Sequence, residues 1–207
     1  MHIAGVENYA RFLLKDIDVV PVNLRTVAGA LAKHRKAGIK MARVPMPDSV
    51  GGMAIFEAGT YVLGVNSKHN HTKRRTTLAH EIAEVALGQL RNATVYQLLK
   101  QRNTKREARA FRLARAILVP DWFVTSVLEA YHVNPAEMAK FIANKCKVSL
   151  DVACLRIRDF NSDYEFELFC KDELLFAYGS NGVNSGYQVK TSVKMGDYIL
   201  VGSKKIS

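Results

Sequence analysis

The stretch TLAHEIAEVALG (residues 77–88) begins like the helix of a zinc protease, but Glu84 stands where the motif H-E-x-x-H has its second histidine. On a helix, His80 and Glu84 are separated by about one turn, so they share a face and could bind one ion together. Glu81 is rotated by about a quarter turn from His80, which suits a base beside the ion rather than a ligand. The alternative is a surface helix with an internal ion pair.

A second helix is predicted at residues 104–119, ended by Pro120, and it places a carboxylate where a core residue is expected. Glu107 falls at the centre of an apolar face that consists of Ala110, Phe111, Ala114 and Leu118. An ionised carboxylate aimed at a core costs several kcal/mol unless it is paired or binds a metal. Glu107 is therefore either a capping-box residue bonded to Thr104 or a third metal ligand, roughly twenty residues after the first two.

Together, the two stretches resemble the ImmA/IrrE family of metallopeptidases, small intracellular gluzincins often encoded beside phage-type repressors. The family pattern is a glycine-led hairpin, then R-x-T-L-A-H-E-x-G-H, then E-x-x-A-N-x-F-A-x-x-L-L-M-P. The similar stretches here are GGMAIFEAGTYVLGVN (51–66), RRTTLAHEIAE (74–84), EARAFRLARAILVP (107–120) and, as a helical segment, AEMAKFIANKCKVSLDVACLRIRDF (136–160). The chain departs from the pattern at Ala83, Glu84, Phe111, Leu113 and Val119, where the family has Gly, His, Asn, Phe and Met.

The resemblance implies that His80 and Glu107 are metal ligands and that Glu81 is the general base of peptide-bond hydrolysis. It does not extend to Glu84, but a glutamate there can reach the same ion, so we interpret it as the third ligand. One histidine with two carboxylates neutralises a divalent ion, which makes bound water less acidic and hydrolysis slower than with two histidines. We expect Zn²⁺, with Mn²⁺ or Fe²⁺ as alternatives because oxygen ligands weaken the preference for zinc.

Two further histidines precede the motif helix. His69 and His71, in SKHNHTKRR (67–75), could reach the site as accessory residues. The alternative is that they are solvated loop residues.

The expected fold is α+β: a mostly helical, minigluzincin-like zincin domain with a small β-sheet or hairpin and a β-rich C-terminal tail. Residues 53–66 predict a hairpin around Glu-Ala-Gly, and the prolines and glycines of residues 44–52 indicate a loop. Further helices are predicted at 4–15, 23–37 and about 74–88, and two or three more run to about residue 158. We divide the chain into a metallopeptidase domain, 1–160, with a helix-turn-helix-like segment at 134–160, and a tail of unknown role, 161–207.

The formal net charge of +11 favours acidic partners, nucleic acid included. Much of the charge lies in TKRR (72–75) and KQRNTKREARAFRLAR (100–115). The helix in the second stretch would carry a basic face made of Lys105, Arg109, Arg112 and Arg115. This face could dock a repressor or DNA, or it could simply be solvated.

The segment 134–160 also resembles a helix-turn-helix. Asn134 and Pro135 would start its first helix, and Ser149 would cap a second that ends with Arg156 and Arg158. In a DNA-binding protein such a second helix enters the major groove. The alternative is a helical pair packed beside the peptidase core.

Other classes of protein are disfavoured. The sequence has no run of about 18 apolar residues that could span a membrane, and no secretory signal is expected at its N-terminus. Its three cysteines, Cys146, Cys154 and Cys170, indicate buried reduced thiols and a cytoplasmic location. We therefore predict a metal-dependent endopeptidase acting on a cytosolic regulator, for which the resemblance implies a transcriptional repressor. The alternative is a catalytically silent relative that binds a repressor or DNA.

Overall fold

The computed structural model of the protein describes residues 5–88, 104–131, 134–170, 173–178, 187–195 and 198–205. The chain forms two compact units, Met1–Pro120 and Asp121–Ser207. No helix in the described ranges is long and apolar enough to cross a membrane.

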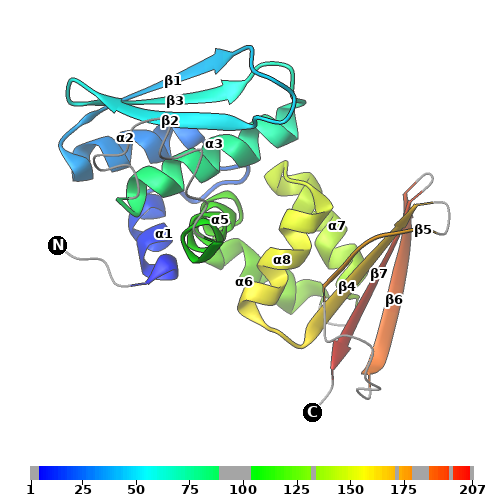
Figure 1. Ribbon diagram of the computed structural model, residues 1–207. Helices are drawn as coiled ribbons and strands as arrows, with labels where there is room; N and C mark the ends of the chain where they lie inside the picture. Colours follow the sequence, from blue (N-terminus) through cyan, green and yellow to red (C-terminus); the bar gives the residue numbers. More distant parts are fainter. Residues whose placement is uncertain are drawn as a thin grey trace. The chain divides into compact units, whose positions relative to one another are not determined.

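The first unit combines a small sheet with helices (Figure 1). Its elements are α1 (Val6–Leu14), α2 (Leu24–Arg35), β1 (Gly38–Val44), β2 (Gly52–Glu57), β3 (Thr60–Asn66), α3 (His71–Ala86) and α5 (Thr104–Leu118). Strand β3 is central, since it pairs in parallel with β1 and antiparallel with β2. Strand β2 is therefore an edge strand, and one of its sides has no neighbour among the described strands.

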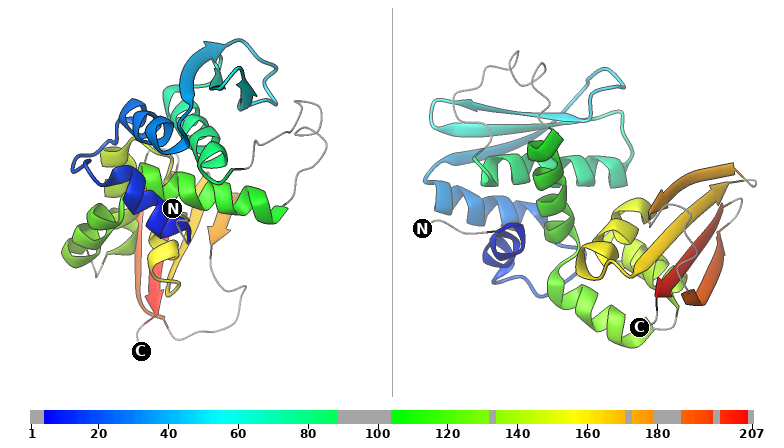
Figure 2. Two further views of the ribbon diagram at one scale, coloured as in Figure 1. Left: turned by 90° about the vertical axis from the view of Figure 1, so that its left-hand side faces the viewer. Right: turned by 60° about the horizontal axis from the view of Figure 1, so that its bottom comes forward.

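Helices α3 and α5 cross each other beneath this sheet. In Figure 1, α3 lies lengthwise under the strands while α5 is seen nearly end-on, and the right-hand view of Figure 2 shows the crossing from another side. The two helices bury apolar faces, which include Ala79, Ile82 and Val85 of α3 and Ala110, Ala114 and Leu118 of α5. This packing brings the two motif stretches together, as their amphipathic spacing predicts.

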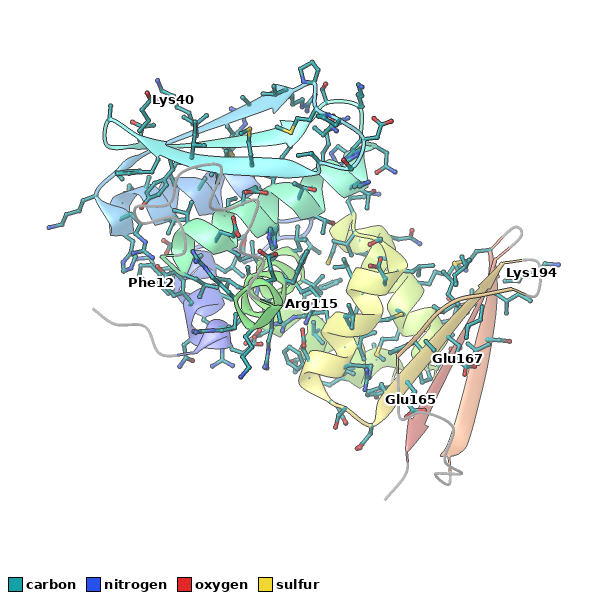
Figure 3. All side chains as sticks on the ribbon, viewed as in Figure 1. Phe12, Lys40, Arg115, Glu165, Glu167 and Lys194 are labelled. Atoms are coloured by element: carbon teal, nitrogen blue, oxygen red, sulfur yellow. The ribbon has the colours of Figure 1, made fainter. Side chains whose placement is uncertain are left out.

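The second unit places helices against a four-stranded antiparallel sheet of order β5-β4-β7-β6. Its elements are α6 (Asp121–Tyr131), α7 (Pro135–Cys146), α8 (Leu150–Phe160), β4 (Tyr164–Cys170), β5 (Glu173–Tyr178), β6 (Tyr187–Met195) and β7 (Tyr198–Lys205). In β4, Tyr164 and Phe166 are buried, whereas Glu165 and Glu167, labelled in Figure 3, are partly exposed. This alternation is the β-like pattern predicted from Tyr164 onward.

The predicted α+β, mostly helical fold is confirmed, and the hairpin of residues 53–66 forms as β2 and β3. Strand β1 was not predicted, because its partner β3 is the second strand of the hairpin, distant in sequence, and nothing local marks the pairing. The compact units divide at Pro120, because α7 and α8 pack against the C-terminal sheet. The domain boundary at residue 160 stays a prediction about the extent of the peptidase domain.

The helix-turn-helix-like segment forms two helices, α7 and α8, but its arginines face the protein. The Asn134 side chain caps α7 by accepting a hydrogen bond from the Glu137 amide at 3.1 Å, whereas Ser149 precedes α8 without a side-chain cap. Arg156 is fully buried and pairs with Asp121 at 2.5 Å. Arg158 Nε donates to the Tyr164 carbonyl at 3.0 Å. The arrangement agrees with a packed helical pair rather than a DNA-reading helix.

Candidate metal centre

Helix α3 is fixed at both ends by side chains bonded to backbone groups. At its start, the Asn70 side chain accepts a hydrogen bond from the Lys73 amide at 2.8 Å. Arg74 donates to the carbonyls of Ser67 and His69, and Arg75 donates to the carbonyl of Val22 at 2.6 Å. Two arginines of the basic stretch 72–75 are therefore engaged in holding the helix.

At the other end of α3, Arg35 of α2 donates to the carbonyl of Ala86. The last carbonyls of a helix have no partner within it, and a cation next to them also opposes the negative end of the helix dipole. Arg35 thus stabilises the end of α3 that follows the motif. Neither this contact nor the anchoring at the start can be seen in a local sequence pattern.

The three predicted metal ligands converge between α3 and α5. His80 Nε2 lies 3.4 Å from Glu107 Oε2 and 3.9 Å from Glu84 Oε1. One ligand atom from each of the three residues lies within 4.8 Å of the others, and all three residues are half-buried. Glu107 turns its carboxylate toward α3, which is the orientation expected of a ligand. The Thr104 side chain, the other member of the proposed capping box, lies outside the described residues.

The donor set fits a divalent cation. Four ligands placed about 2.1 Å from a tetrahedral ion are separated from one another by roughly 3.4 Å. The distances from His80 to the two carboxylates, 3.4 and 3.9 Å, lie near that value. Small adjustments of the side chains would therefore bring the three donors around one ion.

Charge in the centre also favours a cation. Burial and the carboxylates of Glu84 and Glu107 raise the pKa of Glu81 to about 8. Burial and Glu107 raise the pKa of Glu84 to about 6, although Arg106 opposes this shift. Burial lowers the pKa of His80 despite the pull of Glu107, which favours the neutral imidazole that binds metals. Three carboxylates thus lie close together in a poorly solvated place, and a divalent cation would stabilise their ionised forms.

The predicted base, Glu81, lies against the start of the edge strand. Its side chain is 5% exposed. A Cβ atom added to Gly52 would lie 2.5 Å from Thr77 Cγ2, 2.7 Å from the Gly64 carbonyl oxygen and 3.0 Å from Glu81 Oε1. Only glycine fits at position 52 without displacing these groups. The glycine that leads the hairpin therefore sets the distance between β2 and the base.

Asn66 holds the loop that leads into β2. It is fully buried, and its side chain donates to the carbonyls of Val50 at 2.9 Å and Pro47 at 3.0 Å. Its backbone amide donates to the Gly51 carbonyl at 2.8 Å. Sequence reasoning missed this residue, because an asparagine at the end of a strand looks like an ordinary turn residue. The available signal for this role was its position at the end of the glycine-led hairpin.

The structure does not bring His69 and His71 to the ligand cluster. His71 is the first residue of α3, so the helix rise puts it about 13 Å along the axis from His80. His69 Nε2 lies 3.1 Å from the Asp48 carbonyl oxygen. Their accessory role stays a prediction.

The predicted basic face of α5 is exposed at Lys105, Arg109 and Arg112 and half-buried at Arg115, which Figure 3 labels. Arg112 forms an ion pair with Glu7 of α1, with its Nε 3.3 Å from the carboxylate. Part of this charge therefore joins two helices of the first unit. A docking role for the face stays a prediction.

One residue of α5 differs from expectation. Phe111, which we placed on the buried apolar face, is 46% exposed. Its ring lies against the imidazole of His80, with 4.1 Å between the ring centroids and 37° between the planes. Phe111 follows Glu107 by about one helical turn, so both side chains reach the metal centre from one side of α5.

Comparisons with known proteins show the fold and the family of the chain. A comparison with curated proteins found no significant match. Among solved structures, a Mycobacterium tuberculosis transcriptional regulator is similar in fold, with 12% sequence identity and a TM-score of 0.61, covering 98% of this chain and 89% of that one. A family model described as a peptidase family, the IrrE N-terminal-like domain, matches residues 34–158. That match spans more than half of the chain and contains β1–β3, α3 and α5 with all three candidate ligands, and we conclude that the chain belongs to the peptidase family of the IrrE N-terminal-like domain.

Proposed function

We propose that the chain is a metal-dependent endopeptidase that performs limited proteolysis of a cytosolic regulator. The observation that carries this proposal is the convergence of His80, Glu84 and Glu107 beside the buried carboxylate of Glu81. A set of three ligands with a neighbouring acid is the arrangement that water-activating peptidases need. That the regulator is a transcriptional repressor rests on the family resemblance alone.

In this proposal the chain's own residues have separate roles. His80, Glu84 and Glu107 hold the divalent cation, which when bound supplies Lewis-acid activation of water and of the peptide carbonyl. Glu81 takes a proton from the attacking water and returns it to the leaving amine. A pKa of about 8 keeps Glu81 protonated at neutral pH in the metal-free protein. A nearby positive charge lowers the pKa of a carboxyl group, so Glu81 would ionise and act as a base when a cation is held beside it.

The edge of β2 is the natural place for a substrate chain. Extended peptides bind proteins by adding a strand to an exposed sheet edge, where main-chain hydrogen bonds supply affinity for any sequence. Strand β2 begins at Gly52, in contact with Glu81, and has a free side among the described strands. A peptide paired there would run past the base, and a substrate would need an extended, unfolded segment. Proteolysis limited to exposed loops or linkers follows from this requirement.

Glu84 should affect both the choice of metal and the rate of peptide hydrolysis. With two carboxylates and one neutral histidine, the ligands cancel the charge of a divalent ion, so less positive charge remains to acidify water. We therefore propose zinc as the working metal with manganese or iron as competitors, and slower hydrolysis than at a site with two histidines.

The second candidate function is a catalytically silent relative that binds a repressor or DNA. It is favoured by the exposed basic residues Lys105 and Arg109 on α5. Against a DNA-reading role, Arg156 and Arg158 of α8 make contacts within the protein. The two candidates differ in metal content and in hydrolysis.

The test compares the wild-type protein with Glu81→Gln on a peptide library prepared from a whole proteome, with new peptide termini identified by mass spectrometry. Elemental analysis before and after chelation measures bound metal in both proteins. We expect metal in both and metal-dependent cleavage in the wild type alone. Cleavage by Glu81→Gln at the wild-type rate would overturn the assigned role of Glu81. A metal-free wild type without hydrolysis would favour the silent relative.

A further inference from the structure

His80 faces the two carboxylates with one ring nitrogen and the protein interior with the other. Its Nε2 lies 3.4 Å from Glu107 and 3.9 Å from Glu84. Its Nδ1 is buried and has no hydrogen-bond partner among the residues that the structure describes. The ring is therefore placed for metal binding through Nε2, while the opposite nitrogen lacks a described acceptor.

An unpartnered Nδ1 is unusual for a histidine that binds a metal. Such histidines almost always donate this N–H to a carboxylate, a backbone carbonyl or water, which orients the ring and raises its basicity as a ligand. Loss of such a partner typically lowers metal affinity by about 10- to 100-fold. Among the described residues, His80 therefore lacks a contact that ordinarily strengthens metal binding.

The Phe111 ring packs over the imidazole of His80. The planes of the two rings are inclined by 37° and their centroids are 4.1 Å apart, so they are closer to parallel than to edge-on. The Nδ1–H bond lies in the imidazole plane and consequently points along the phenyl ring more than at its face. Even a well-directed N–H···π contact is weak beside a bond to oxygen. Phe111 can restrain the ring by packing, but it cannot accept the proton as a carbonyl oxygen would.

We propose that Phe111 is a positioning residue of the metal centre, which holds His80 by ring packing in place of a hydrogen bond and thereby weakens its binding of metal. This inference rests on the proposed metal-binding function. The orientation of His80 then depends on an apolar contact on α5, the same helix that supplies Glu107. The centre releases its ion more readily than one in which Nδ1 is hydrogen-bonded.

The test replaces Phe111 with asparagine, whose side-chain oxygen is a hydrogen-bond acceptor, and with leucine, which is apolar and has no acceptor. Both remove the phenyl ring, so leucine is the matched control for loss of packing. Zinc affinity is measured for wild type, Phe111→Asn and Phe111→Leu by competition with a chromophoric chelator. The Nδ1 proton of His80 is followed by NMR in protein labelled with ¹⁵N-histidine.

We expect zinc affinity about 10-fold higher than wild type for Phe111→Asn, with a newly protected Nδ1 proton, and affinity below wild type for Phe111→Leu. If the wild type binds zinc and Phe111→Asn binds no more tightly than Phe111→Leu, the inference is wrong while the proposed function stands. If neither the wild type nor any variant binds zinc, both the inference and the proposed metal-dependent function are overturned. Folding of each variant is checked by its circular dichroism spectrum, and the single substitution Phe111→Gln repeats the test with a longer acceptor.

Discussion

Gly52 and Glu81 touch across the space between β2 and α3: the Oε1 atom of Glu81 lies 3.0 Å from the point where a Cβ on residue 52 would be. The backbone of the edge strand and the proposed base are thus held at a fixed separation. Any side chain at position 52 must move one of them. The relationship connects the shape of the hairpin to the chemistry of the motif helix.

Gly52→Ala should therefore impair hydrolysis while leaving the metal bound. The added methyl group would meet the Gly64 carbonyl oxygen at 2.7 Å and Thr77 Cγ2 at 2.5 Å, so β2 must shift. Such overpacking typically costs about 1–3 kcal/mol of stability. The matched control is Gly29→Ala on α2, where a Cβ meets no atom within 4 Å. Thermal melts, zinc content and cleavage rates of both variants test the prediction, and unchanged cleavage by Gly52→Ala contradicts it.

The stability of the metal-free protein should fall as pH rises. The folded state keeps a proton on Glu81 up to a pKa of about 8, whereas the unfolded chain releases it near the ordinary value of 4.5. Between those values the folded state binds more protons, so the free energy of unfolding decreases with pH by at most about 1.4 kcal/mol per unit. Glu84 adds to the slope up to a pKa of about 6.

Thermal melts in chelator, from about pH 5 to pH 8, measure this slope. Glu81→Gln should flatten it above about pH 6, and Glu57→Gln, at the exposed end of β2, should not. Saturating zinc should reduce the slope in the wild type, because the cation favours ionised carboxylates. A wild-type slope that survives in Glu81→Gln would assign the effect to other groups.

Glu84→His should tighten zinc binding and raise hydrolysis. The substitution gives a site with two histidines and one carboxylate, and its charge rises by one unit. We expect zinc affinity to increase by about an order of magnitude and the preference for zinc over manganese to grow. Glu84→Ala should weaken the binding of both zinc and manganese. Parallel titrations of the three proteins with zinc and manganese measure these effects, and identical curves would exclude Glu84 as a ligand.

Glu107→Ala separates the two roles that the sequence left open. As a ligand, Glu107 is 3.4 Å from His80, and its loss should lower metal affinity by orders of magnitude. As a capping residue alone, its loss would cost about 0.5–2 kcal/mol of stability and leave the metal unaffected. Zinc titration and thermal melts of the same sample distinguish the outcomes. Full zinc occupancy with a lower melting temperature would assign Glu107 to the helix end.

The alternative function makes its own prediction for the basic face of α5. If it binds duplex DNA, affinity should fall steeply with salt, and Arg109→Gln should reduce the salt slope by about 1. Arg109 is the better choice because Arg112 already pairs with Glu7. Fluorescence anisotropy at several salt concentrations measures the slope. An absence of binding at low salt would remove nucleic acid as a partner of this face.

The convergence of His80, Glu84 and Glu107 could be predicted from sequence because these residues lie at helical spacing on two amphipathic helices. His80 and Glu84 share a face through the repeat of α3, and Glu107 stood out as a charge on an apolar face. The features that support the centre could not be predicted in the same way. Asn66 and Arg35 act on backbone carbonyls that are distant in sequence. Phe111 looked like a core residue because periodicity gives the direction of a side chain but not what covers it.

The helix pair α7–α8 illustrates the same limit. Asn134 and Pro135 correctly marked the start of α7, because capping is a local property. Arg156 ends the helix that could have entered a DNA groove, yet it is buried against Asp121 and lies over the Phe160 ring. Only tertiary packing decides whether a charge faces solvent or a partner within the protein.

The three proposed ligands come from two helices, His80 and Glu84 from α3 and Glu107 from α5, so an ion held by all three would link the two helices reversibly. A ligand that binds only the folded protein stabilises it by mass action, by about 2.7 kcal/mol when its concentration is 100 times the dissociation constant. A readily released ion makes this stabilisation follow the free metal concentration. If the proposed metal site is correct, the cellular lifetime of the protein should rise and fall with metal supply.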